Sequence, residues 1–256
     1  MVTQETPVKN PHAGHRKRLR ERYARSGMED FAPHEVLELL LTYAIPRIDV
    51  NPMAHALIKE FGSVAGVLDA TVEDLRKVDG VGPEAAMFLK MLPEVFRHYQ
   101  LSGYDDGESY DTVAKLGDYL RALYTGVTVE RVYLVLLDNS LKLIDCIPLG
   151  EGSVNCSSVT VRSIAEKALR GNASAVVLAH NHPRGLAIPS GADLEVTQTV
   201  ECALETIGVP LLEHLIVTEN SYAPILRHHK GLLRSSPKTG QIDKAFYERF
   251  YGEERS

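Results

Sequence analysis

The chain has 256 residues, of which 44% are hydrophobic and 24% charged, and its formal net charge at pH 7 is -6. This composition can bury a sizeable core, which excludes wholesale disorder and fibrous repeats, and the length suits one large domain or two smaller ones. Apolar runs end well before the roughly 18 residues of a membrane-spanning helix, and the first residues lack the apolar stretch of a secretory signal. We therefore expect a cytoplasmic protein without a membrane partner.

Cysteine content and charge distribution narrow the possible functions. The three cysteines include no Cys-x-x-Cys pair, which argues against a disulfide framework and against a thiolate zinc site. Residues 1–104 hold 13 basic and 14 acidic residues, whereas 105–256 hold 15 and 20. Since nucleic acid favours a basic surface, we expect any DNA binding in the first part, where Arg16 to Arg25 form a basic run.

The first part of the chain is expected to be helical. From about residue 15 to 100 the apolar residues recur at helical spacings, and strand-like runs are lacking. A helix is predicted between Pro33 and Pro46. The next is expected to open with Asn51 as its N-cap and to stop at Gly62.

Two further helices and a linker complete this part. Thr71, with an acidic residue three positions on, predicts the capped start of a short helix, and a longer one should run from Pro83 to about Tyr99. The segment 101–111 is rich in Gly, Ser and Asp and is expected to be the linker. We predict a helical domain over 1–104 and a second domain over 105–256.

Buried strands alternate with helices in the second domain. Strands are expected at 130–138, 141–149, 174–180 and 209–218, and helices at 113–124, 161–169 and 191–207. The order predicts an α/β domain with a mixed sheet that helices cover on both faces, a three-layer α-β-α arrangement. We assign no function to the tail after Leu233.

The segment 179–197, AHNHPRGLAIPSGADLEVT, concentrates the chemistry of the chain. His180 and His182 stand two apart at the end of a strand, so both imidazoles should point to the same side and share one metal ion. A loop then leads to Ser190 at the start of a helix, with Asp193 in its first turn. Two imidazoles and one carboxylate suit zinc with the fourth position left for water, although Ser190 and Asp193 are equally consistent with a capping box.

A zinc hydrolase also needs a proton acceptor. Glu130 stands at the start of a buried strand, where its carboxylate could reach a metal-bound water while the strand stays in the core. It is equally consistent with a solvated strand-end charge, and Glu151 and Glu166 are alternatives.

These residues carry a resemblance to a known family. The string HNHPxGxxxPSxxD at 180–193, with EHLIV at 213–217, resembles the JAMM (MPN-type) metalloprotease domain of the bacterial RadC family. The segments HEVLELLLTYAIPRIDVNP, FGSVAGVLDA and VDGVGPEAA resemble its helical N-terminal region. Arg184 departs from the Ser common in relatives, and the segment around Arg162 lacks the usual Pro and Glu, which further favours Glu130 as the base.

The resemblance implies a set of roles. His180, His182 and Asp193 would bind zinc, Glu130 would activate the zinc-bound water, and Ser190 would hydrogen-bond that water or the oxyanion. The implied reaction is cleavage of an amide or isopeptide bond in a peptide or protein substrate.

Further features stay open. His214 matches the family's string and either lies beside the site or is an ordinary core residue. The turn at 80–82 resembles a helix-hairpin-helix element, which with the basic run suggests a DNA-binding or repair-accessory role and a structural or inert metal site. Asp74, Asp79 and Glu84 around this turn would repel phosphate.

Overall fold

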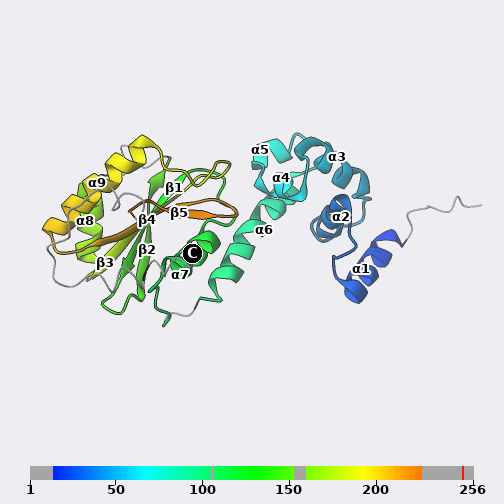
Figure 1. The fold of residues 1–256 in the computed structure, drawn as a ribbon. Coiled ribbons are helices and arrows are strands. Elements are labelled where there is room, and N and C mark those ends of the chain that lie inside the picture. The colour runs from blue at the N-terminus through cyan, green and yellow to red at the C-terminus, as the bar shows by residue number, and fades with distance from the viewer. Residues whose placement is uncertain (1–13, 105–106, 153–159, 227–249, 251–256) are drawn as a thin grey trace, which may run out of the picture. The chain divides into compact units, whose positions relative to one another are not determined.

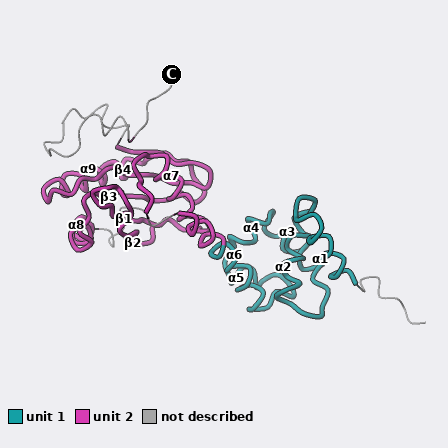
Figure 2. Tube along the Cα trace, turned by 90° about the horizontal axis from the view of Figure 1, so that it is seen from below, with its two compact units in different colours: residues 1–95 teal, residues 96–256 magenta. Residues whose placement is uncertain are grey.

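The computed structural model describes residues 14–104, 107–152, 160–226 and 250. The chain divides into two compact units, residues 1–95 and 96–256 (Figure 2). Within the described part of the chain, no helix is both long enough and apolar enough to span a bilayer.

The first unit is helical. Its elements are α1 (His15–Ser26), α2 (Pro33–Ala44), α3 (Asn51–Phe61), α4 (Val64–Asp69), α5 (Val72–Leu75) and α6 (Pro83–Leu101), the last of which continues into the second unit (Figure 1). Leucines at helical spacings form the core, and Leu37, Leu41 and Leu57 are fully buried. As predicted, α3 ends at Gly62, whose positive φ of 80° favours glycine.

Two polar side chains of this unit bond to groups that are distant in the sequence, and the predicted N-cap role of Asn51 is wrong. Asn51 does not cap α3 but is its first helical residue, and its amide donates to the buried carboxylate of Glu38 at 2.8 Å. Arg16 of the basic run donates to the main-chain carbonyl of Ile45 at 2.9 Å, at the end of α2. In both cases the side chain hydrogen-bonds to a residue of another part of the helical unit.

The second unit has three layers. It contains α7 (Val113–Leu123), β1 (Arg131–Leu137), β2 (Leu143–Glu151), α8 (Val161–Arg170), β3 (Ala175–Asn181), α9 (Gly191–Thr206), β4 (Leu211–Val217) and β5 (Tyr222–Pro224). The strand order is β2-β1-β3-β4-β5, with β3 and β4 parallel and the other pairs antiparallel. Helix α7 covers one face, and α8 and α9 cover the other (Figure 1). The predicted mixed sheet with helices on both faces is confirmed; the short β5 was not predicted.

The end of α6 and the segment after it belong to the second unit and pack within it. Arg97 donates to the carbonyl of Thr125 at 3.3 Å, and Tyr104 meets Tyr119 edge-on with ring centroids 5.4 Å apart. Tyr110, in the segment expected to be the linker, is 2% exposed and belongs to the core of this unit. These aromatic residues anchor the segment on the α7 side of the sheet.

Strand β3 positions the site because both of its faces are buried. Val177 and Ala179 join the core on the α7 side, whereas Val176 and Leu178 join the core beneath α8 and α9. Since side chains alternate along a strand, the next even-numbered residue, His180, points to the side of α8 and α9.

Candidate metal centre

Two imidazoles meet at the end of β3. The Nε2 atoms of His180 and His182 lie 3.1 Å apart, as expected for residues two apart on a strand. Nδ1 of His182 lies 2.8 Å from the main-chain oxygen of Leu186 in the loop that follows. A carbonyl only accepts, so Nδ1 of His182 carries the proton and the Nε2 of the neutral ring keeps its lone pair.

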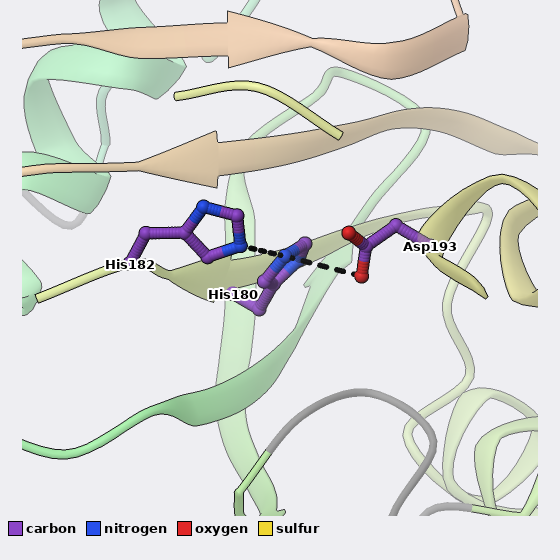
Figure 3. A group of neighbouring side chains, drawn as sticks. All are labelled: His180, His182 and Asp193. Atoms are coloured by element: carbon purple, nitrogen blue, oxygen red, sulfur yellow. Dashed lines mark hydrogen bonds and ion pairs between the residues drawn. The ribbon is translucent and has the colours of Figure 1, made fainter. Parts of the chain in front are cut away.

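The first turn of α9 adds a carboxylate. Oδ1 of Asp193 lies 3.4 Å from Nε2 of His180, and Figure 3 shows the three side chains directed toward one another. The other oxygen, Oδ2, accepts hydrogen bonds from the main-chain N–H and the hydroxyl of Ser190, both at 2.7 Å. The predicted capping box is therefore present, and it holds Asp193 so that Oδ1 faces the histidines.

The geometry of this group fits a metal ion. One donor atom from each of His180, His182 and Asp193 lies within 4.8 Å of the other two. Nitrogen and oxygen ligands of a tetrahedral zinc ion, each about 2.0–2.1 Å from the metal, lie about 3.3 Å apart. The observed separations of 3.1 and 3.4 Å are close to that spacing.

Burial keeps His180 in its neutral form. The side chain is 1% exposed, and its pKa is lowered to about 4: burial is the largest cause, Asp193 raises the pKa, and His182 lowers it. A neutral imidazole is the form that binds a metal ion. Proton competition for this ring is therefore weak at neutral pH.

Glu130 lies just before β1, on the strand next to β3. The antiparallel pairing of β1 with β3 reaches His180 and Val132, which lies two residues after Glu130 in the chain. The pairing thus places Glu130 at the same end of the sheet as the two histidines.

Asn181, between the two histidines, holds the segment that carries Glu130. Its amide oxygen accepts from the main-chain N–H of Arg131 at 2.7 Å, and its amide nitrogen donates to the carbonyl of Val129 at 3.0 Å. These bonds engage the main chain on both sides of Glu130. Asn181 is 3% exposed, and its role was not predictable from the sequence because its partners lie about 50 residues earlier.

The two alternative bases have arginine partners. Glu151 pairs with Arg131 at 2.5 Å and Glu166 with Arg162 at 3.0 Å, and both carboxylates are substantially exposed. Arg184 is exposed on the loop between the site residues. Glu130 directly precedes β1, the strand whose pairing with β3 reaches His180.

Two further buried residues, His214 and Thr197, lie next to His180 in a row of contacts that the sequence did not reveal. His214 of β4 is fully buried, and its Nε2 lies 2.8 Å from Nδ1 of His180. Thr197 of α9 lies 2.6 Å from Nδ1 of His214. The family string at 213–217 pointed to His214, whereas nothing in the sequence pointed to Thr197.

Comparison with known proteins identifies the domain that contains this cluster. Residues 110–231 match the model of the RadC-like JAB domain, and residues 12–87 match that of the UPF0758 N-terminal region. A UPF0758 protein of Fusobacterium nucleatum subsp. nucleatum is 37% identical over 227 residues, which cover 86% of this chain and 97% of the relative. The chain therefore belongs to the UPF0758 family, whose RadC-like JAB domain here contains the cluster of His180, His182 and Asp193.

Proposed function

We propose that this chain is a zinc-dependent hydrolase of the JAMM type, which cleaves an amide or isopeptide bond in a peptide or protein substrate. The observation that carries the proposal is the convergence of His180, His182 and Asp193 within 4.8 Å, with His180 at the spacing of tetrahedral zinc ligands from each of the other two. Two imidazoles and one carboxylate suit zinc and leave a fourth position open. The match to a RadC-like JAB domain supports the same reaction class.

The metal and Glu130 would have different roles in the hydrolysis. A bound zinc ion would lower the pKa of a water ligand to roughly 7 and polarise the substrate carbonyl. Glu130 would accept the proton of the attacking water and return it to the nitrogen of the leaving amine. Such acid-base catalysis contributes about 10²–10⁴ in rate.

Ser190 has two tasks in this mechanism. In the structure its single hydroxyl proton is donated to Oδ2 of Asp193. To stabilise the oxyanion of the substrate, the hydroxyl must rotate, and Oδ2 then keeps the bond from the main-chain N–H of Ser190. One such oxyanion donor contributes about 3 kcal/mol to the stability of the transition state.

Glu130→Gln and His182→Ala test the proposal in the full chain. Zinc content is measured by mass spectrometry, and hydrolysis is measured on internally quenched peptides, half of them joined through a lysine side-chain amide. Glu130→Gln should keep zinc and lose turnover, whereas His182→Ala should lose zinc. Glu166→Gln, which removes an exposed carboxylate paired with Arg162, is the control and should match the wild type. Equal turnover in Glu130→Gln and the wild type would remove Glu130 from the mechanism, and a zinc-free wild type would refute the metal site.

A second candidate function, DNA binding, is favoured by helix α1. Four of its cations are exposed: Lys17, Arg18, Arg20 and Arg25. The other two act inside the unit, because Arg16 donates to α2 carbonyls and Arg22 pairs with Glu35 at 2.7 Å. The four exposed cations lie at the surface, where Lys17 pairs with Glu21 at 3.7 Å and Arg20 lies over the Tyr43 ring. Contacts of such surface cations with phosphate supply most of sequence-independent affinity.

The glycine turn before α6 supports DNA binding less well than α1. Asp79 and Glu84 beside it are both exposed, and Asp74 is neutralised by Lys77 at 2.6 Å. We therefore place the DNA contact on α1. Fluorescence anisotropy of a labelled duplex at several salt concentrations tests this, and replacing three α1 cations by Glu should weaken binding and reduce its salt dependence. No binding of the wild type at 50 mM salt would end this candidate.

A further inference from the structure

A hydrogen-bond chain buried between α9, β4 and β3 connects two of the candidate ligands. It begins at the main-chain oxygen of Asp193, which lies 2.5 Å from the hydroxyl of Thr197. The hydroxyl lies 2.6 Å from Nδ1 of His214, and Nε2 of His214 lies 2.8 Å from Nδ1 of His180. All four residues are buried, with exposures between 0% and 5%.

The first acceptor fixes the direction of the first two bonds in this chain, and the neutral form of His214 fixes the third. The Asp193 carbonyl has no proton, so the Thr197 hydroxyl must donate to it. The Thr197 oxygen must then accept from His214, which places the proton of His214 on Nδ1. Burial keeps His214 neutral, so its Nε2 is an acceptor and Nδ1 of His180 donates to it. The lone pair of His180 is therefore left on Nε2.

That atom is the one which faces the other candidate ligands. Nε2 of His180 lies 3.1 Å from Nε2 of His182 and 3.4 Å from Oδ1 of Asp193. The opposite tautomer would place a proton there and block metal binding. Metal-binding histidines generally donate their second ring N–H to an acceptor, which fixes the ring and makes it a better ligand.

We propose that His214 and Thr197 are positioning residues, which hold His180 in the Nδ1–H tautomer and so present its Nε2 to the metal. This inference rests on the proposed metal site and deepens it. The hydrogen bonds through His214 of β4 connect His180 on β3 with Asp193 on α9. They therefore also fix the position of these two ligands relative to each other. The tautomer of His182 is fixed more simply, by one hydrogen bond from its Nδ1 to the main-chain carbonyl of Leu186 in the loop.

The residues Thr197 and Thr199 offer a matched test. Thr197→Val keeps the side-chain volume but removes both of its hydrogen bonds, and Thr197→Ser keeps the hydroxyl. The control is Thr199→Val, because the Thr199 hydroxyl makes the same bond to the carbonyl four residues earlier, at 2.8 Å, but is exposed. Zinc affinity of the full chain is measured by competition with a chelator. We expect a loss of about 10- to 100-fold for Thr197→Val and near wild-type affinity for the other two.

A second measurement needs neither a variant nor a metal. Long-range ¹H–¹⁵N correlation spectra of the metal-free wild type at pH 7.5 distinguish the two neutral tautomers, and both His180 and His214 should carry their proton on Nδ1. An Nε2–H tautomer at His180, or unchanged zinc affinity in a folded Thr197→Val, would overturn the inference. If the wild type binds zinc with the expected tautomers but hydrolyses no peptide, the proposed function fails and this inference stands. If the wild type binds no zinc, the spectra still decide the tautomer.

Discussion

Acidification should destabilise the metal-free second unit through His180. The unfolded chain protonates histidine near pH 6.5, whereas burial lowers the pKa of His180 in the folded chain to about 4. Between these values the unfolded state binds more protons than the folded state. The free energy of unfolding should therefore be unaffected by this group above about pH 6.5, and it should fall as the pH decreases from 6.5 to about 4.

The size of the effect follows from the two pKa values. The difference between 6.5 and about 4, at 1.36 kcal/mol per pKa unit, corresponds to roughly 3 kcal/mol for complete protonation. About 2 kcal/mol of this is lost by pH 5, because there the unfolded histidine is almost fully protonated and the folded one is not. His214 acts in the same direction, because burial and then the neighbouring His180 also lower its pKa.

Urea unfolding in the presence of a chelator at pH 7.5 and 5.0 measures this loss. Tyrosine fluorescence is a suitable signal, since the chain has 11 Tyr and no Trp. The decrease in unfolding free energy between the two pH values should be about 2 kcal/mol smaller in His180→Gln than in the wild type. His98→Gln, which removes an exposed histidine, should reproduce the wild-type decrease. Equal decreases in His180→Gln and the wild type would refute the reasoning.

Further variants separate the structural and chemical tasks of the site. Ser190→Ala and Thr160→Ala each remove the hydroxyl that caps a helix, α9 and α8 respectively, so each should cost about 1 kcal/mol in thermal unfolding. Only Ser190→Ala should also lower peptide turnover, by about 10²–10³; equal turnover in the two variants would contradict the assigned role. Asn181→Ala leaves two main-chain groups beside Glu130 without their partner and should cost about 1–3 kcal/mol in stability. It should lower kcat more than zinc content, and parallel losses of both would show that Asn181 supports the fold alone.

Much of the site could be predicted because its ligands obey local rules. Side chains two apart on a strand share a face, which brings His180 and His182 together once β3 forms. Ser190 and Asp193 are three apart at a helix start, where the capping box fixes both. The alternation of apolar strands and amphipathic helices likewise predicted the mixed sheet between two helical layers.

The basic run shows where such local rules end. By composition all its cations were equal candidates for phosphate contacts. The tertiary structure directs Arg16 to the end of α2, pairs Arg22 with Glu35, and leaves the other four cations of α1 at the surface. Which arginine caps a helix depends on how α1 and α2 pack, and nothing within one helix specifies that.

The sequence by itself determined which residues could bind a metal ion, because their spacing acts within one strand and one helical turn. Only the tertiary structure decided what holds them. His214 follows His180 by 34 residues and meets it through the parallel pairing of β3 and β4. Asn181 reaches the segment of Glu130 through the antiparallel pairing of β3 and β1. Strand register and helix packing depend on the whole core, so contacts of this kind become visible only in the folded chain.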